Sequence, residues 1–407
     1  MKVLALNCGS SSVRCHLFET SVETIETGKD RKLGGVLVDR IGAPEARVRI
    51  EAGGAVEELS HPIPDHHQAI ELSVKTLLER LRLEVADKDE IAAVGHRVVH
   101  GGEEFSAPVE LDDRVAAEIE GLNDLAPLHN PVNLRGYRAA RMVLPHARHV
   151  AVFDTAFHQS MEPRAYVYGL PDHLWRRLKI RRYGFHGSSH RYVSFRFAQI
   201  HGASKNGYKL ITCHLGNGCS ITAVKDGRSV DTSMGFTPLE GLLMGTRCGD
   251  LDPGALLHIM GREGLTPVEM DQLLNRQSGL AGLSMASNDM RTLLDLRRRG
   301  HSAAALAVDV FCYRIKKYIG AYFAALNGCD ALIFTGGIGE NSPAVRAEVC
   351  RELDALGIHL DPARNENTLA QEASIGKTGS PVDVWVIPAD EALVIARDAL
   401  RCLAGVA

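Results

Sequence analysis

The chain has 407 residues, of which 45% are hydrophobic and 24% are charged, as in ordinary globular proteins. This length predicts two domains of roughly 150 to 200 residues each. The formal net charge of −4 lacks the basic surplus of a nucleic-acid-binding protein, so we expect small ligands and no nucleic acid.

Cysteine usage and hydropathy indicate the compartment. The nine cysteines form no Cys-x-x-Cys pair, and we expect reduced thiols in a cytoplasmic protein. The apolar stretch at residues 3–6 is too short for a signal peptide. The most apolar helix candidate, residues 303–326, carries four charged side chains, so we expect no membrane span.

The chain opens with the pattern of a strand, a glycine and serine turn, and a second strand. We expect strands at residues 3–7 and 13–18, joined by a turn that contains Gly9, Ser10 and Ser12. Glycine lets backbone amides approach an anion, and small hydroxyls add donors without bulk. The turn is therefore a candidate phosphate contact, although a purely local role is the alternative.

The same pattern recurs two hundred residues later. An apolar run at residues 209–214 leads into a second turn of Gly, Asn and Ser residues and then into another strand at residues 221–224. A tight turn is expected after that strand, at Asp226 and Gly227. Two such units indicate an internal duplication of a phosphate-facing hairpin.

A third glycine-rich stretch follows the apolar run at residues 331–334. We interpret residues 335–341 as another turn, which leads into a helix with Ser342 as its N-cap. Strands that alternate with helical patterns favour an α/β architecture. The chain lacks G-x-x-x-x-G-K-[ST], and its opening lacks G-x-G-x-x-G, so the phosphate site is of another type.

Two arginines lie among small or apolar residues, where a charge is costly unless an anion pairs with it. Arg97 interrupts an apolar run that reads as a buried strand, and Arg247 lies between small residues. One interpretation is a structural pair, with Asp250 or Asp252 as the partner. The other is a clamp for a carboxylate or a transferring phosphoryl group.

Two carboxylates follow predicted strands. Asp154 ends the run at residues 149–153, where an acid can serve as a base, a metal partner or a helix cap. Glu391 follows the run at residues 384–388 and starts a helix. It can serve the helix dipole or hold Mg²⁺ beside substrate phosphates.

The histidines raise a competing hypothesis. His186 and His190 are spaced i,i+4, which is compatible with a metal hydrolase, but Gly187 disfavours a helix there and the Glu of H-E-x-x-H is missing. A helix-entry role for the intervening serines is the structural alternative. We interpret the basic stretch at residues 176–182 as a solvated or interface face without chemistry.

Taken together, these stretches resemble the acetate kinase family in order and spacing over nearly the whole chain. The matching blocks are residues 7–12, 95–102, 127–131, 153–158, 183–187, 214–218, 231–241, 245–247 and 335–341. The resemblance implies reversible, ATP-dependent phosphorylation of acetate to acetyl phosphate with Mg²⁺. It also implies two duplicated domains of the sugar kinase, Hsp70 and actin type (ribonuclease H-like), with a cleft between them. We place the domains at residues 1–154 plus 392–407 and at residues 155–391, and the family suggests a homodimer.

The resemblance also implies roles for individual residues. The catalytic set is Asp154, His186, Arg247 and Arg97, and the metal contacts are Asn7 and Glu391. The acetate site comprises Arg97, Val99, Leu128, His129, Phe185 and Pro238. The nucleotide site comprises Ser12, Arg14, His214, Leu215, Gly216, Asn217, Gly218, Asp289, Met290, Arg291, Gly337, Ile338, Gly339, Glu340 and Asn341.

The chain departs from the family pattern at two places. Arg14 stands where the family usually has lysine, which keeps the charge but changes its reach. Residues 389–392 replace the usual Thr-Asn-Glu-Glu, although Glu391 is retained. The alternatives are a propionate or butyrate kinase of the same superfamily, and an actin- or Hsp70-like nucleotide-gated binding protein. Val99 favours acetate, because a smaller side chain there would admit another methylene.

Overall fold

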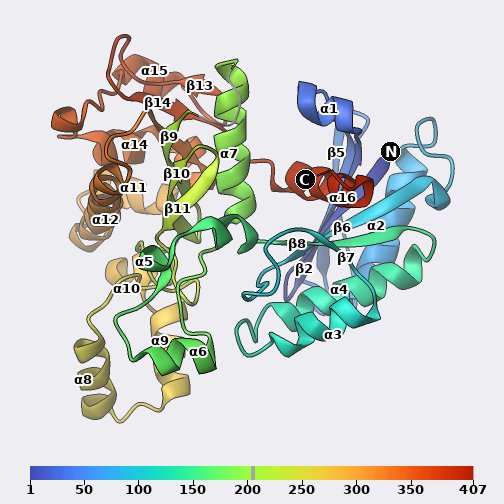
Figure 1. The fold of residues 1–407 in the computed structure, drawn as a ribbon, viewed down its shortest axis with the longest axis horizontal. Helices are drawn as coiled ribbons and strands as arrows, with labels where there is room; N and C mark the ends of the chain where they lie inside the picture. The colour runs from blue at the N-terminus through green and yellow to red at the C-terminus, as the bar shows by residue number, and fades with distance from the viewer. Residues whose placement is uncertain (203–206, 407) are drawn as a thin grey trace. The chain divides into compact units, whose positions relative to one another are not determined.

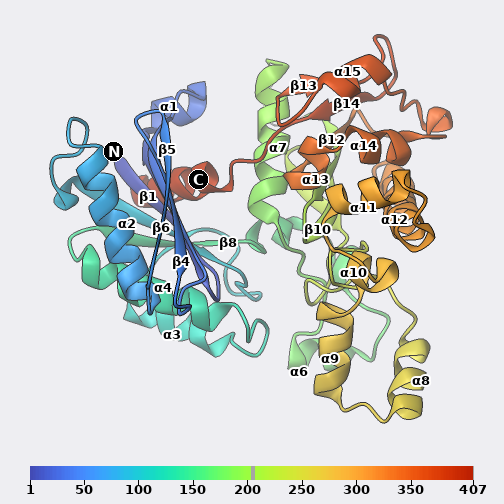
Figure 2. The ribbon, with the colours of Figure 1, turned by 180° about the vertical axis from the view of Figure 1, so that it is seen from behind.

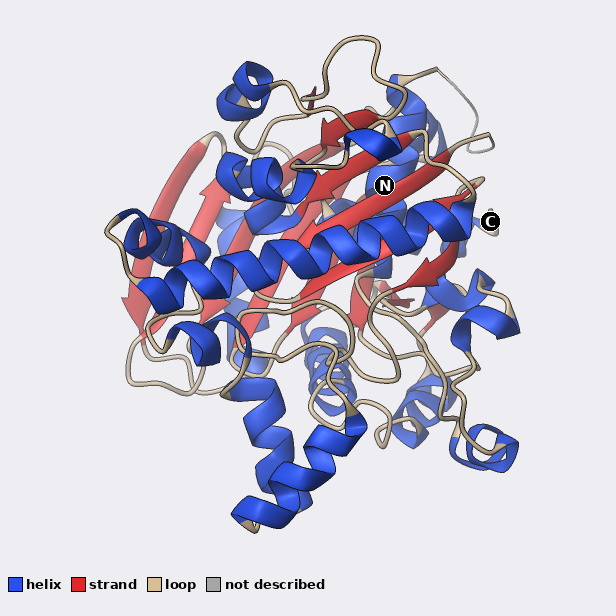
Figure 3. Cartoon of the chain, turned by 90° about the vertical axis from the view of Figure 1, so that its left-hand side faces the viewer, coloured by secondary structure: helices blue, strands red, loops and turns tan. Residues whose placement is uncertain are grey.

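The computed structural model describes residues 1–202 and 207–406, which divide into two compact units. The first unit comprises Met1–Ala156 and Asp390–Ala407, and the second comprises Phe157–Ala389. Figure 1 labels their elements, Figure 2 gives the reverse view, and Figure 3 distinguishes strands from helices by colour. None of the helices that the structure describes is long and apolar enough to cross a membrane.

The first unit is built on an eight-stranded sheet of order β5-β4-β3-β2-β1-β6-β8-β7. Parallel pairing joins β1 to β6 and β6 to β8, whereas β2 to β5 form an antiparallel meander. The strands are β1 (Lys2–Cys8), β2 (Ser12–Glu19), β3 (Arg31–Asp39), β4 (Ala46–Ala52), β5 (Ala55–His61), β6 (Ile91–Val98), β7 (Val109–Glu110) and β8 (Arg148–Phe153). The helices are α1 (Val22–Thr27), α2 (His66–Arg80), α3 (Asp113–Gly121), α4 (Asn130–Val143) and α16 (Glu391–Ala404).

Helices cover both faces of this sheet because its central strands are apolar on both sides. Leu4 and Leu6 of β1 belong to a core that includes residues of α2 and α4, whereas Val3 and Ala5 pack with residues of α16. This alternation follows the two-residue period of a strand. The C-terminal helix thus completes the first unit, as Figure 1 shows for the red helix beside the blue strands.

The second unit is built on a six-stranded sheet of order β11-β10-β9-β12-β14-β13. Its strands are β9 (Lys209–Leu215), β10 (Cys219–Lys225), β11 (Arg228–Thr232), β12 (Ala331–Thr335), β13 (Ala373–Ser374) and β14 (Asp383–Val386). Its helices are α5 (Pro163–Tyr166), α6 (Asp172–Leu178), α7 (Gly187–Ile200), α8 (Pro253–Glu263), α9 (Pro267–Arg276), α10 (Gly279–Ser284), α11 (Met290–Arg298), α12 (Ser302–Leu326), α13 (Gly336–Asn341), α14 (Pro343–Cys350) and α15 (Pro362–Asn367). Val193 and Phe197 of α7 pack with strand residues of this sheet, and α12 contacts β9 and β10.

The predicted duplication of the opening hairpin is confirmed by the strand order. In the first unit β3-β2-β1-β6-β8 runs antiparallel, antiparallel, parallel, parallel. In the second, β11-β10-β9-β12-β14 repeats that sequence of directions. The tight turn after β10 is also confirmed, since Asp226 and Gly227 both have positive φ.

One predicted turn is wrong. Residues 336–341 form the short helix α13 instead of an extended glycine turn. Thr335 occupies the N-cap position, and the carboxylate of Glu340 accepts a hydrogen bond from the Gly336 amide at 2.8 Å. An acidic side chain that reaches back to the first helical amide stabilises a helix start, and this compensates for the flexibility of the glycines. Ser342 is the residue before α14, as predicted.

Candidate active site

The ends of β6 and β8 bring Arg97 and Asp154 together. These strands are parallel neighbours, and the Asp154 amide continues their ladder by donating to the Val98 carbonyl at 3.0 Å. Arg97 Nε donates to both oxygens of Asp154 at 3.0 Å, and Nη2 donates to Oδ2. The Asp154 side chain is 3% exposed and that of Arg97 is 24% exposed. Asp154 is therefore an ion-pair partner and not a helix cap.

The electrostatics of this pair favour an orienting role for Asp154. Burial raises the pKa of the carboxyl, and the positive charge of Arg97 opposes that rise. Burial also favours loss of the Arg97 proton, but Asp154 and Glu391 outweigh it and raise the pKa of the guanidinium. A carboxylate with both oxygens bound to a guanidinium fixes its position in a bidentate manner. The Nε and Nη2 edge of the Arg97 guanidinium is thus held by Asp154, whereas Nη1 does not bond to that carboxylate.

Two further oxygen-bearing side chains surround this pair. Arg97 Nη1 lies 3.5 Å from Oδ1 of Asn7, at the end of β1. Glu391, the first residue of α16, acts electrostatically on both Arg97 and Asp154. Amide and carboxylate oxygens suit Mg²⁺, which keeps several waters and takes few protein ligands. Across the described residues no three His, Cys, Asp or Glu side chains lie together so that they could hold a metal ion.

Two asparagines of α4 position the segment that follows β6. The side chain of Asn133 accepts from the Val99 amide at 3.1 Å and donates to the Cys8 carbonyl at 3.0 Å. Asn130 bonds both backbone groups of His100. Val99 is consequently fixed and 6% exposed. In the same unit, Leu128 is exposed and His129 is half-buried at the start of α4.

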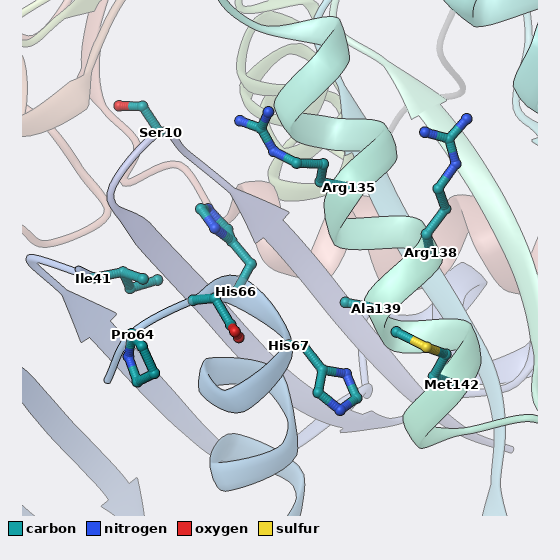
Figure 4. A pocket seen from close by; sticks show the side chains of 10 residues that line it. Ser10, Ile41, Pro64, His66, His67, Arg135, Arg138, Ala139 and Met142 are labelled. Carbon is teal, nitrogen blue, oxygen red and sulfur yellow. The ribbon is translucent and has the colours of Figure 1, made fainter. Parts of the chain in front are cut away.

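The β1–β2 turn is tied to α2. The Gly9 amide donates to the Ser12 carbonyl at 2.8 Å, and the Gly9 carbonyl lies 2.7 Å from Nε2 of His66. Ser10 lines an open pocket of about 470 Å³, with His66 on the same side and Arg135 of α4 on the other (Figure 4). Ser12 is half-buried and Arg14 is exposed.

In the second unit, the predicted nucleotide segments converge on the β9–β10 turn. The Gly245 amide donates to the Asn217 carbonyl at 3.0 Å, and Asn288 contacts the Asn217 side chain at 3.2 Å. Gly336 has a φ of 78°, and a Cβ there would lie 2.8 Å from the Leu215 carbonyl oxygen. Only glycine permits this approach of α13 to the turn. The segments at residues 214–218, 289–291 and 336–341 are therefore neighbours within one unit.

Several members of this predicted nucleotide set have structural contacts of their own. Asp289 is the N-cap of α11 and pairs with Arg291 at 2.7 Å, and this pairing lowers the pKa of Asp289 to about 2. Glu340 caps α13, and buried Arg346 donates to the Gly339 carbonyl at 2.8 Å. By contrast, a Cβ added to Gly337 would meet nothing within 4 Å, which leaves space beside α13.

His186 and Arg247 converge on the same glycine of the β9–β10 turn. A Cβ placed on Gly218 would lie 3.5 Å from His186 Nε2 and 3.6 Å from Arg247 Nη1. The imidazole of His214 stacks on that of His186, with ring centroids 4.3 Å apart. A ring nitrogen of His186 and a guanidinium nitrogen of Arg247 thus both lie near Gly218, where the backbone carries no side chain, an arrangement that suits a transferring phosphoryl group.

The structural pairing considered for Arg247 is wrong. Its Nη1 donates to the Pro238 carbonyl at 3.2 Å. Asp250 instead accepts from the Gly241 amide and from Tyr318, and Asp252 caps α8. Burial lowers the pKa of Arg247. Arg247 is half-buried, and among the residues that the structure describes it forms no carboxylate pair, which gives it the character of an anion clamp.

The metal-hydrolase alternative is not supported. Gly187 begins α7 instead of preventing it, with His186 as the N-cap in the left-handed region at φ 57°. His186 and His190 both contact the hydroxyl of Ser220, at 2.9 and 2.7 Å. A hydroxyl therefore bridges the two rings where the alternative would place a metal.

The basic stretch at residues 176–182 is not uniformly a solvated face. Arg182 is largely buried, pairs with Glu240 at 2.5 Å, and donates to the Thr232 carbonyl at 2.8 Å. Arg181 is 5% exposed and lies over the Tyr166 ring. These contacts brace the loop that leads to Pro238. Pro238, a predicted acetate-site residue, is half-buried, and Phe185 is buried.

The residues that sequence reasoning missed are polar positions inside apolar elements. Asn130 and Asn133 are spaced i,i+3 on a helix and are buried, and Ser220 is a buried residue of β10, between Cys219 and Ile221. Polar side chains that recur on an apolar face are the signal that identifies them. Asn133 and Ser220 contact the predicted site residues Val99 and His186 directly, and Asn130 contacts His100 next to Val99.

A family model described as the acetokinase family matches residues 2–397. The chain is 48% identical to an acetate kinase of Dictyoglomus turgidum, over 98% of this chain and 97% of the relative. It is also 48% identical to an acetate kinase of Thermotoga maritima, over 98% of both chains.

Solved structures agree with these relatives. A crystal structure of Porphyromonas gingivalis acetate kinase matches with a TM-score of 0.91 and 44% identity, over 99% of both chains. A propionate kinase from Francisella tularensis matches with a TM-score of 0.88 and 40% identity, over 98% of both chains. The predicted α/β fold class, with two domains of the sugar kinase, Hsp70 and actin type, is confirmed.

Proposed function

The chain belongs to the acetokinase family, and we propose that Arg97 binds the acceptor carboxylate in the reversible, ATP-dependent phosphorylation of acetate to acetyl phosphate that this enzyme catalyses. The observation that carries the proposal is the bidentate Arg97–Asp154 pair, in which Nη1 is directed to Asn7. A guanidinium fixed in this way is matched to the planar geometry of a carboxylate.

The chemistry requires charge neutralisation more than proton removal. Acetate is already an anionic nucleophile, so the enzyme must overcome repulsion between anions and align the reactants in line. Arg97 supplies positive charge to the acceptor. His186 and Arg247, which converge beside Gly218, supply donors to the transferring phosphoryl group. Asp154 then acts by orienting Arg97.

The remaining site assignments are part of the same proposal. Val99, Leu128, Phe185 and Pro238 would surround the methyl group, with His129 as a second phosphoryl contact. The nucleotide would contact the segments at residues 214–218, 289–291 and 337–341, together with Ser12 and Arg14. The proximity of these three segments in the second unit supports this assignment. Asn7 and Glu391 would hold Mg²⁺, which when bound neutralises phosphate charge.

Acetate-dependent ADP release tests this function. The purified enzyme is incubated with Mg-ATP with and without acetate, ADP is measured, and acetyl phosphate is trapped with hydroxylamine. We expect ADP and acetyl phosphate in equal amounts, and only when acetate is present. ADP release that does not require acetate would favour an actin- or Hsp70-like nucleotide-gated protein, which has no need of a carboxylate clamp.

Propionate is the second candidate acceptor, because one similar structure is that of a propionate kinase. Buried Val99 favours the smaller acid, since it occupies the space that another methylene would need. Comparison of kcat/KM for acetate and propionate decides between them. A higher value for propionate would overturn our choice of acetate.

The homodimer and the cytoplasmic location are also proposals. None of the eleven described residues of α8 is buried, and Leu257 of that helix and nearby Val268 are 68% and 67% exposed. An apolar face of this kind suits a second copy of the chain. Analytical ultracentrifugation of the wild-type chain and of Leu257→Glu would test it, with a shift toward monomer expected. All nine cysteines lie within the described residues and are free, which supports a reducing compartment.

A further inference from the structure

A continuous line of polar groups lies behind His186 in the second unit. His186 Nδ1 lies 2.9 Å from the hydroxyl of Ser220, which lies 2.7 Å from His190 Nε2. His190 Nδ1 lies 2.7 Å from the hydroxyl of Thr212, and that hydroxyl lies 3.4 Å from the Thr222 carbonyl oxygen. The line connects α7, β10 and β9, and it ends at a backbone acceptor.

His190 is the group that sets the direction of this line. It is fully buried, and its two ring nitrogens contact hydroxyls rather than carboxylates. Burial, reinforced by the nearby rings of His158 and His214, lowers its pKa well below the usual range. His190 is therefore neutral, with one nitrogen that donates and one that accepts.

Only one set of proton positions makes all four contacts hydrogen bonds. The Thr222 carbonyl can only accept, so the Thr212 hydroxyl donates to it and must accept from His190 Nδ1. His190 Nε2 then accepts from the Ser220 hydroxyl. Because that hydroxyl has a single proton, it can only accept from His186 Nδ1.

We infer that Ser220 and His190 are positioning residues that hold His186 in the tautomer protonated on Nδ1. The inference rests on the proposed role of His186 as a donor to the transferring phosphoryl group. In this tautomer the lone pair of the neutral ring is on Nε2, the nitrogen that would lie 3.5 Å from a Cβ on Gly218. Nε2 can therefore donate to a phosphoryl oxygen only when His186 is an imidazolium.

The groups around His186 determine whether its ring carries one proton or two. The ring is faced by Arg247 from the loop after β11, by His214 from β9, and by His190 from its own helix through Ser220. Bound phosphate oxygens would favour the imidazolium, because two N–H groups would then be satisfied by Ser220 and the phosphoryl group. Without the Ser220 hydroxyl, Nδ1 loses this hydrogen bond, which no longer favours the tautomer protonated on Nδ1 over the other tautomer.

Nitrogen-15 NMR of histidine-labelled enzyme tests the tautomer directly. We expect the wild-type His186 signals, assigned with His186→Gln, to show Nδ1 protonated and Nε2 unprotonated in the neutral ring. In Ser220→Ala we expect a mixture of the two tautomers, and we expect Ser220→Thr, which keeps the hydroxyl, to restore the wild-type pattern. The wild-type spectrum alone decides the matter if Ser220→Ala does not fold. Nε2 protonation in the neutral wild-type ring would overturn the inference.

Measurements of kcat and KM distinguish a positioning role of Ser220 from a general loss of structure. We expect Ser220→Ala to lower kcat about tenfold, the effect of one lost hydrogen bond, while the KM for ATP and acetate changes less than about twofold. Ser194→Ala is the matched control, since it removes a different buried hydroxyl, on α7, that donates to the His190 carbonyl. Equal loss in both variants would contradict positioning. If His186→Gln keeps wild-type turnover, the proposed role of His186 fails, but the NMR result still judges the tautomer.

Discussion

In the Arg97–Asp154 pair, a buried carboxylate holds a guanidinium in a fixed position. Burying a guanidinium without a partner is costly, and the cost is offset here by a bidentate carboxylate. Because both Asp154 oxygens accept hydrogen bonds from Arg97, we propose that the carboxylate orients Arg97 and does not act as a base. Its removal should leave Arg97 charged, unsupported and free to rotate.

We expect Asp154→Asn to lower kcat/KM for acetate by about 10² to 10³, the range for losing one preorganised electrostatic group. The amide keeps the shape of the carboxylate but cannot neutralise Arg97. Steady-state kinetics with acetate as the varied substrate measure the loss. Asp113→Asn, which removes an exposed partner of Arg141 in the same unit, serves as the control and should stay near wild type. Near wild-type turnover in Asp154→Asn would refute the orienting role.

Val99 should set the size of the acceptor. Val99→Ala removes two methyl groups from a buried position, so we expect the ratio of kcat/KM for propionate to that for acetate to rise at least about tenfold. Val98→Ala is the matched control, because Val98 packs in the core beside β8 and not at the loop. It should cost stability without changing the ratio. An unchanged ratio in Val99→Ala would remove Val99 from the acetate site.

Single residues differ in how well the sequence predicts them. Arg97 was predictable as a site candidate because a charge inside an apolar run needs an explanation. The partner was not, since Asp154 lies 57 residues away and meets Arg97 only because β6 and β8 are parallel neighbours. Ser220 was missed as a functional group, and His190 was considered only as a possible metal ligand, because a hydroxyl or a histidine in an apolar element is ordinary until its contacts are known.

Among the glycine-rich elements too, local sequence signals were predictable and contacts from more distant side chains were not. The two hairpins were predicted because alternation and turn residues are local signals. The stretch at residues 335–341 was misread, since its glycines disfavour a helix in isolation. The helix forms because Glu340 caps it and Arg346 binds its carbonyl groups. Both contacts depend on side chains that reach back over the element, which a propensity argument does not include.

The β1–β2 turn yields a prediction about two adjacent serines. Ser12 is half-buried and its carbonyl closes the turn, whereas Ser11 is exposed and its carbonyl accepts from the Ile41 amide. We expect Ser12→Ala to raise the KM for ATP about tenfold, the effect of one lost hydrogen bond to a charged group. Ser11→Ala should leave it within about twofold. Initial rates at varied ATP measure both, and equal tolerance of the two changes would return the turn to a purely structural role.

At the scale of the whole molecule, the sequence predicted the duplicated sheets but not the buried histidines that lie in both units. Repeated hairpins imply repeated sheets, and the matching strand directions confirm this. Buried histidines were noted only as possible ligands. His96, His158 and His190 are all buried, in both units, with partners that suit neutral rings. Burial lowers the pKa of each of them.

These rings should make the folded protein sensitive to acid. Burial lowers the pKa of His158 from its usual 6.5 to about 4, so between these values the unfolded chain binds a proton that the folded chain does not. The free energy of unfolding must therefore fall as pH drops below 6.5, by up to about 1.4 kcal/mol per pH unit for each such histidine. Urea unfolding at pH 7.5 and 5.5 measures the change. We expect His158→Gln to lose about 1 kcal/mol of that pH dependence, because the glutamine side chain does not titrate. The amide can still donate to the Phe185 carbonyl, which Nε2 of His158 contacts at 3.0 Å. Exposed His173→Gln is the control and should keep the wild-type difference. If both variants retain it, folding does not lower the pKa of His158, and its burial does not govern the acid response.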